Sequence, residues 1–229
     1  MDKDTTGFLL TKHLSKQVQS GDSKIHILRD VNLNIKAGES VAILGTSGSG
    51  KTTLLSILAG LDLPTSGEVY FDQHALHELS EEERARLRAD DVGFIFQTFQ
   101  LLPTLTALEN VMLPLEIQYV PQKRAREEAI EWLNRVGLGA RLHHYPKRLS
   151  GGEQQRVAIA RAFVNQRKII FADEMTGNLD TQTGQMVADI LFSLNQECQT
   201  TLVLVTHDER LAARCQHRFI LSEGTLQAC

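Results

Sequence analysis

The chain has 229 residues, of which 42% are hydrophobic and 23% are charged, and its formal net charge at pH 7 is −4. These values are ordinary for a globular protein that folds in water, and they give no global basic field of the kind expected of a nucleic-acid binder. No stretch approaches the roughly 18 to 20 apolar residues that a membrane span needs, and the first residues lack a secretion-signal pattern. We therefore expect a cytoplasmic chain that does not itself cross a bilayer.

A chain of this length is most simply one domain, or one core with an inserted subdomain. Its three cysteines, Cys198, Cys215 and Cys229, are an odd number without a CxxC spacing. This pattern indicates neither a zinc site nor a full disulfide framework, so we predict buried or free thiols.

The first third of the chain predicts strands on both sides of a glycine-rich turn and its helix. Residues 31–35 alternate apolar and polar side chains, which predicts a half-exposed strand, and the apolar run 40–44 predicts a buried strand. A helix is expected over residues 53–60 and is closed by Gly60. Residues 67–72 predict a further strand.

The middle of the chain is mainly helical in character. Ser80 and Glu83 form a capping-box pattern that starts a short charged helix ending near Arg88. From about Thr98 the pattern turns helical, and Pro121 opens an amphipathic helix that runs up to Gly137. The apolar side chains of this helix are Ala125, Ala129, Ile130, Leu133 and Val136. We expect its charged side chains, Arg124, Arg126, Glu127, Glu128 and Glu131, to form a solvated face.

The last third predicts a helix from about Ser150 and then two continuous apolar strands, 168–172 and 201–205. Such runs are typical of central strands of a parallel sheet that is covered on both faces. Residues 218–221 and 222–226 predict a terminal hairpin or strand pair.

The strongest chemical signal is a glycine-rich run that fits the pattern GxxxxGK[ST] and lies between a predicted buried strand and a predicted helix. The expected nucleotide-binding residues are Gly45, Thr46, Ser47, Gly48, Ser49, Gly50, Lys51, Thr52 and Thr53. Glycines let backbone N–H groups converge on phosphates, and the helix N-terminus adds positive potential. We expect Lys51 to reach the β- and γ-phosphates and Thr52 to offer its hydroxyl to Mg²⁺. The matched context disfavours the alternative of a chance glycine turn.

A second signal is Asp173-Glu174 at the end of the apolar run 168–172. A carboxylate at the C-terminal end of such a strand can hold a metal through water, and the next one can orient or deprotonate an attacking water. The alternative is surface charge, which the preceding buried strand disfavours. Ser150 precedes Gly151 and Gly152 as an expected N-cap, which by itself indicates only a helix start able to attract an anion.

The phosphate loop, the LSGGE run 149–153, the Asp173-Glu174 pair and His207 after a strand occur in this order. Together they resemble the ABC ATPase family over nearly the whole chain. The resemblance implies ATP and Mg²⁺ as cofactors and catalytic roles for Glu174 and His207. It also implies that Gln97 and Asp173 contact the metal together with Thr52.

The same resemblance implies that the chain works as a pair. Ser150, Gly151 and Gly152 would contact the γ-phosphate of ATP bound to a second copy, and the loop 178–180, which contains Asp180, would cross the dimer seam. Stretches 101–111, 173–180 and 204–215 are similar to the bacterial branch of LolD, MacB and YbbA-type ATPases, most of all the YbbA type. That branch implies an integral membrane permease-type partner, membrane contact only through this partner at the cytoplasmic face of the inner membrane, no nucleic acid, and lipid, lipoprotein or hydrophobic cargo.

Two residues depart from the family pattern. Met175 replaces the proline that usually follows the catalytic glutamate, which could loosen the following turn because methionine does not fix φ. Val18 falls where an aromatic residue usually stacks on adenine, and His13 or His26 could supply a ring in its place.

We expect an α/β P-loop NTPase (RecA-like) core with a parallel-sheet centre, N-terminal antiparallel strands and an inserted α-helical subdomain. Residues 1–97 and 161–229 would form the nucleotide-binding core of a single ABC ATPase domain, and 98–160 the insertion with the signature motif. A soluble scaffold or regulatory ABC ATPase without a membrane partner is the main alternative. A DNA-repair or chromosome-organising ATPase is disfavoured because the insertion lacks sustained heptads.

Overall fold

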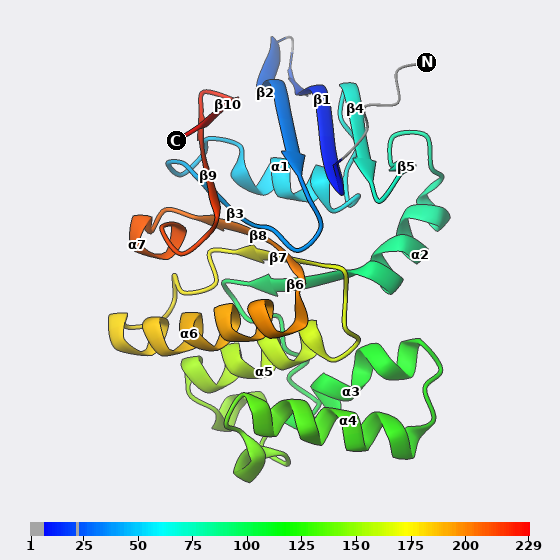
Figure 1. Ribbon diagram of the computed structural model, residues 1–229, viewed down its shortest axis with the longest axis vertical. Helices are drawn as coiled ribbons and strands as arrows, with labels where there is room; N and C mark the ends of the chain where they lie inside the picture. The colour runs from blue at the N-terminus through cyan, green and yellow to red at the C-terminus, as the bar shows by residue number, and fades with distance from the viewer. Residues whose placement is uncertain (1–6, 22) are drawn as a thin grey trace. The chain divides into compact units, whose positions relative to one another are not determined.

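The computed structural model describes residues 7–21 and 23–229, and these divide into two compact units (Figure 1). The first unit comprises the described residues up to Val92 together with Thr201–Cys229, and the second comprises Gly93–Thr200. The expected boundaries of the helical insertion, 98–160, stay a prediction.

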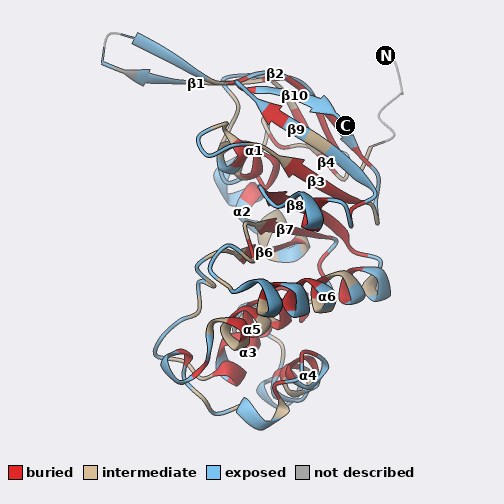
Figure 2. Cartoon of the chain, turned by 90° about the vertical axis from the view of Figure 1, so that its left-hand side faces the viewer, coloured by how far each residue is buried: buried red, intermediate tan, exposed pale blue. Residues whose placement is uncertain are grey.

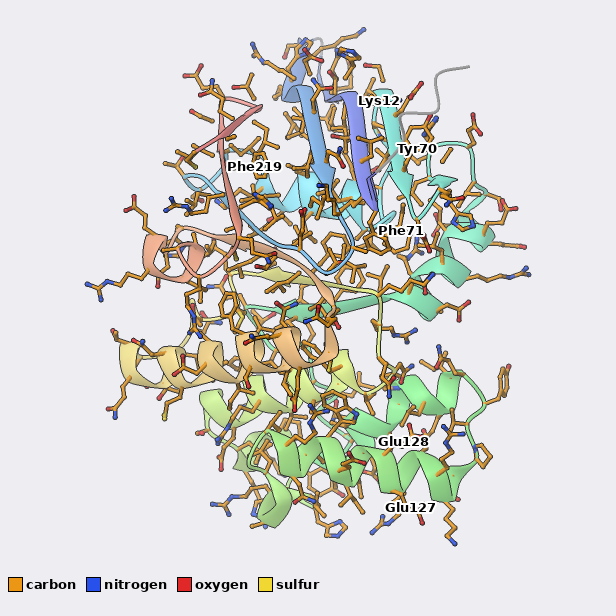
Figure 3. All side chains as sticks on the ribbon, in the orientation of Figure 1. Lys12, Tyr70, Phe71, Glu127, Glu128 and Phe219 are labelled. Atoms are coloured by element: carbon orange, nitrogen blue, oxygen red, sulfur yellow. The ribbon has the colours of Figure 1, made fainter. Side chains whose placement is uncertain are left out.

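The first unit contains an antiparallel sheet with the strand order β2-β1-β4-β5. Its strands are β1 (Leu9–Ser20), β2 (Ser23–Ile35), β4 (Ser66–Phe71) and β5 (His74–Ala75). The predicted alternation over 31–35 is confirmed, because Val31, Leu33 and Ile35 are buried and the two asparagines between them are exposed. On the other face, the Lys12 ammonium lies 5.7 Å from the centre of the Tyr70 ring (Figure 3).

Strand β2 is longer than the predicted strand 31–35, since it begins at Ser23, and it forms a hairpin with β1. Irregular register between Thr11 and Gln17 marks bulges in β1, and His13 and Asp30 both have positive φ there. Beyond the bulges, the paired ends of the strands are largely exposed (Figure 2). They form an arm that carries little core.

The expected parallel sheet is confirmed in the same unit. β3 (Ser40–Leu44) pairs in parallel with β8 (Thr201–Thr206) and with β9 (His217–Ser222). β10 (Thr225–Ala228) pairs antiparallel with β9, so the predicted terminal hairpin is also confirmed. Every residue of β8 is buried, which is typical of a central strand.

Three helices accompany these sheets. α1 (Lys51–Leu58) lies against β4 and β8, and α7 (Glu209–Ala212) lies against β3 and β8. α2 (Glu81–Asp91) starts with the predicted capping box of Ser80 and Glu83 and runs three residues past the predicted end. Within α2, Glu81 pairs with both Arg84 and Arg88 at 2.7 Å, which extends the charged helix.

The second unit is mainly helical and contains β7 (Ile169–Asp173) and, from Gly93 on, the neighbouring strand β6 (Val92–Phe96). Its helices are α3 (Ala107–Ile117), α4 (Gln122–Arg135), α5 (Gly151–Phe163) and α6 (Thr181–Cys198), with the short 3₁₀ helices η1 (Gly139–Arg141) and η2 (Pro146–Arg148). α5 packs against α3, α4 and α6. The predicted solvated face of α4 is confirmed by its exposed or half-buried charges, among them Glu127 and Glu128 (Figure 3).

The expectation that helix begins at about Thr98 is wrong. Residues 98–106 form turns, because Phe99 and Gln100 have positive φ of 60° and 52°, which no right-handed helix accommodates. Helix α3 starts only at Ala107, where Thr106 and Glu109 form a capping box that the sequence analysis missed.

All three cysteines are free thiols, as predicted, and burial raises the pKa of Cys215 to about 12. Among the described residues, no helix is both long and apolar enough to cross a membrane.

Candidate nucleotide-binding site

The glycine-rich loop joins the end of the largely buried strand β3 to α1 in the first unit. Gly50 has φ of 101°, and a Cβ there would lie 3.0 Å from the carbonyl oxygen of Ile27, so both conformation and space require glycine. The Lys51 ammonium donates to the carbonyl oxygens of Gly45 at 2.8 Å and Thr46 at 2.9 Å. The lysine charge is thereby held against the loop, and Lys51 is only 7% exposed.

The start of α1 is suited to an anion. Its N-cap is a glycine, and its first turn consists of Lys51, two threonines and a leucine, so no acidic side chain opposes the positive end of the helix. The Ser49 hydroxyl is buried within the loop and has no hydrogen-bond partner in the structure. A phosphate oxygen would accept a hydrogen bond from this hydroxyl, and these residues therefore fit a nucleoside triphosphate.

His207 lies at the same edge of the parallel sheet as the loop. In the paired strands Leu44 is the partner of Thr206, so Gly45 and His207 each follow directly after paired residues. The next residue, Asp208, caps α7 by accepting the backbone N–H groups of Arg210 and Leu211. The imidazole is exposed and is carried on a chain segment fixed on both sides.

In the second unit, Gln97 is tied to the loop that follows β7. Its Nε2 donates to Oδ1 of Asn178 at 3.2 Å, and Nδ2 of Asn178 donates back to the Gln97 carbonyl at 3.0 Å. The Gly177 N–H closes the turn after Glu174 by donating to its carbonyl oxygen at 2.9 Å. The structure thus brings Gln97 to the turn 174–178, which directly follows Asp173 at the end of β7.

The substitution of methionine at position 175 does not open this turn. Met175 is fully buried, and Glu174 adopts φ of 44°. A non-glycine residue in this region is strained, and it is held here by the buried neighbour and by the hydrogen bond across the turn. The methionine side chain therefore stabilises the turn by packing, where proline would restrict φ.

The signature run begins α5. The Ser150 hydroxyl accepts the backbone N–H of Glu153 at 3.3 Å, and the Glu153 carboxylate accepts the N–H of Ser150 at 2.8 Å, which confirms the predicted N-cap. A Cβ on Gly152 would lie 2.3 Å from Cγ2 of Thr183, so this close approach of α5 to α6 requires glycine. Asp180 caps α6, and the pKa of its carboxyl is lowered mainly by the hydrogen bonds to Thr183.

Two contributions to this region were missed by the sequence analysis. Arg161 donates to the carbonyl oxygens of Gln100 at 2.6 Å and Phe99 at 3.0 Å, and burial lowers the pKa of its guanidinium. The sequence contained one indication of this role, the charged Arg161 within the otherwise apolar run 157–163. Asn178 was assigned to the seam loop, but nothing in the sequence indicated that it pairs with Gln97.

A glycine loop between a parallel strand and a helix, with a lysine folded onto it, defines a P-loop nucleoside triphosphatase. Residues 28–177 match the family model of the ABC transporter ATP-binding domain, described as "ABC transporter". The chain belongs to this family and is an ATP-binding, ATP-hydrolysing subunit of the ABC type.

Several relatives are similar over nearly their whole length. The ABC transporter ATP-binding protein YbbA of Escherichia coli (strain K12) is 55% identical over 215 residues, which are 94% of either chain. The lipoprotein-releasing system ATP-binding protein LolD of Hydrogenovibrio crunogenus is 49% identical over 94% of either chain. Among solved structures, the dimeric ATP-binding cassette MJ0796 in a post-hydrolysis state with ADP and Pi has a TM-score of 0.88, with 44% identity and 96% of each chain covered.

Proposed function

We propose that the chain is the motor subunit of a membrane transporter complex and that two copies close around two ATP molecules. The observation that carries this proposal is the loop before α1. The Lys51 ammonium lies against this loop, and no side chain caps the N-terminus of α1, so both can bind a phosphate. The dimeric state of the similar cassette MJ0796 supports a pair.

In the first unit, the loop N–H groups and Lys51 bind the phosphates and compensate the charge that develops on them during transfer to water. Thr52, which is exposed at the start of α1, would supply an oxygen to Mg²⁺. His207 acts on the γ-phosphate from the end of β8. Each role uses a side chain that the local fold fixes next to the loop or at the same strand edge.

In the second unit, Glu174 orients or deprotonates the attacking water, and Asp173 and Gln97 would help to hold the metal ion. The donors assigned to Mg²⁺ are a hydroxyl, a carboxylate and an amide oxygen, and hard cations prefer such oxygen ligands. When bound, the ion would neutralise charge on the phosphates. Ser150, Gly151, Gly152 and Asp180 act toward the second copy of the chain.

We further propose that the partner is an integral membrane permease-type subunit, so that the chain works at the cytoplasmic face of the inner membrane. The similarity to lipoprotein-releasing ATPases favours lipid, lipoprotein or hydrophobic cargo. The roles proposed above all concern ATP, Mg²⁺ or the second copy of the chain, so we assign the choice of cargo to the partner.

The test of the catalytic assignment is Glu174→Gln. ATP binding should survive because the phosphate ligands remain, and hydrolysis should stall because the water loses its base. A stable ATP-dependent dimer should then accumulate, measurable by sedimentation with and without ATP. A variant that hydrolyses ATP at the parental rate would remove Glu174 from this role.

The test of the paired arrangement is Ser150→Arg. A long cationic side chain at the start of α5 should abolish hydrolysis without affecting ATP binding to the same chain's loop, which lies in the other unit. Mixed with a Lys51→Ala chain, it should regain at most one of two composite sites. Unchanged activity of Ser150→Arg would contradict the sharing of ATP between copies.

The alternative of a soluble regulatory ATPase predicts no membrane partner. Tagged chain purified from detergent-solubilised membranes of its own host should bring down a stoichiometric integral membrane protein under the transporter proposal. Purification of the chain without such a protein, from membranes and cytosol alike, would favour the alternative.

A further inference from the structure

We propose that Arg141 is a positioning residue that neutralises Glu153 and thereby lets the start of α5 accept the phosphate of ATP on a second copy. This inference rests on the proposed role of Ser150. It explains how α5, which begins in the signature run 149–153, tolerates an acidic residue in its first turn.

Glu153 stabilises the helix but disfavours binding of a phosphate at its start. Its carboxylate closes the capping box by accepting the Ser150 N–H at 2.8 Å, so it stabilises the start of α5. The same carboxylate lies within one turn of the serine that is proposed to meet the γ-phosphate. An uncompensated negative charge there repels a phosphate and offsets the favourable end of the helix dipole.

Arg141 is placed to compensate this charge. Its Nε donates to Oε1 of Glu153 at 3.1 Å, while the other carboxylate oxygen is used by Ser150. The pKa of Glu153 lies below its usual value, first because of the Ser150 backbone hydrogen bond and further because of Arg141, so the carboxylate is ionised. The pair is partly solvated, with the Arg141 side chain 49% exposed and that of Glu153 19% exposed.

The backbone of Arg141 is fixed independently of this pair. Its N–H donates to the Leu138 carbonyl oxygen at 2.8 Å in η1, and the next residue, Leu142, accepts the N–H of Leu108 at 3.0 Å. Its Nη1 also lies 3.4 Å from Nε2 of His144. The arginine is therefore presented to α5 by the fold of residues 138–144, so Arg141→Met should remove the charge and leave the segment in place.

The experiment compares Arg141→Met, Glu153→Gln and the double variant, each in the Glu174→Gln background that accumulates the ATP-bound dimer. Arg141→Met should weaken ATP-dependent dimerisation about fivefold per site, the upper range for a partly exposed charge interaction. Because a symmetric pair closes two such sites, the dimer dissociation constant should rise about 25-fold. Added salt should reduce the difference from the parent.

The double variant is decisive. Glutamine keeps the capping box but carries no charge, so Glu153→Gln should restore dimerisation to Arg141→Met and tighten it when introduced alone. Binding of a fluorescent ATP analogue to the monomer's own loop should be the same in all variants. Arg124→Met on α4, which removes an exposed pair with Glu128 at 2.7 Å, is the matched control and should change nothing.

Three results would overturn the inference. A double variant as weak as Arg141→Met would mean that the arginine does not act through Glu153. Glu153→Gln alone weakening the dimer as much as Arg141→Met would mean that the geometry of the pair, and not its charge balance, matters. If Ser150→Arg abolishes dimerisation and Arg141→Met has no effect, this inference alone is rejected. If Ser150→Arg has no effect, the proposed function on which the inference rests is rejected.

Discussion

Val18 lies in the β1–β2 arm, at the position where we predict contact with the nucleotide base. It pairs across the hairpin with Ile25, and the two residues are 38% and 50% exposed. Strand β2, which carries Ile25, passes the phosphate loop at Ile27, next to Gly50. His13 is engaged with Asp30 at 2.7 Å, which leaves His26 as the ring at the outer part of the arm. We therefore expect the base to meet aliphatic side chains instead of a stacking aromatic.

We predict weak discrimination of ATP from GTP, under about tenfold in kcat/KM, since one decade corresponds to ~1.4 kcal/mol. Loss of a stacking contact costs roughly 1–3 kcal/mol by analogy with base stacking on aromatic side chains in nucleic-acid binders. Val18→Tyr should restore the contact and raise the preference for ATP, and His26→Ala is the control for a substituting ring. Strong ATP preference in the parent that neither substitution changes would show that other residues form the base site.

Gln155 is a second residue with a measurable consequence. It is fully buried in α5, and neither its amide nitrogen nor its amide oxygen has a hydrogen-bond partner in the structure. A buried unpaired amide costs roughly 1–3 kcal/mol, so Gln155→Met, which keeps the length of the side chain, should raise the free energy of unfolding by about 1 kcal/mol. Urea unfolding measures this. A clear loss of stability would indicate that the amide binds a buried water.

At the scale of elements, the segment from Phe99 to Pro114 divides into a core part and an exposed part. Leu108, Val111 and Met112 are buried on α3, whereas Leu102 is 43% exposed in the turn that precedes it. Core packing therefore accounts for the helix, whereas Leu102 is exposed and can make a further contact. A partner's apolar surface would bury it.

We predict that Leu102→Glu lowers stimulation of hydrolysis by the membrane partner at least about tenfold, because a charge in an apolar interface loses its solvation. The rate of the isolated subunit should stay close to that of the parent, since the side chain belongs to a solvated turn. The measurement is ATPase activity with and without partner in detergent or lipid. Leu102→Met is the control, and full stimulation of the glutamate variant would place the partner elsewhere.

At the scale of the whole molecule, helix caps link stability to pH. The pKa values of Glu83 and Glu109 are lowered mainly by hydrogen bonds from their capping-box serine and threonine, and that of Glu153 by the Ser150 N–H. A carboxylate with a lowered folded-state pKa stabilises the protein above its unfolded pKa of about 4.3 and loses this contribution as pH falls through the folded value.

We therefore predict that the urea midpoint is constant from about pH 7 to 5 and falls steadily below about pH 4.5. Replacing Glu83, Glu109 and Glu153 together by glutamine keeps the caps and removes these titrations, so the fall should be shallower. An equally steep fall in the triple variant would assign acid sensitivity to other carboxylates.

The sequence by itself determined the features that depend on near neighbours along the chain. The phosphate loop, the Ser80 and Ser150 caps and the alternation of 31–35 were all predictable, because backbone N–H groups and side chains a few residues apart create them. Tertiary structure decided what depends on distant residues: the parallel pairing of β9 with β3, the bond of Gln97 to Asn178, and the Arg161 contacts that accompany the turns at 98–106. These need partners that only the folded chain brings together, and no local pattern records them.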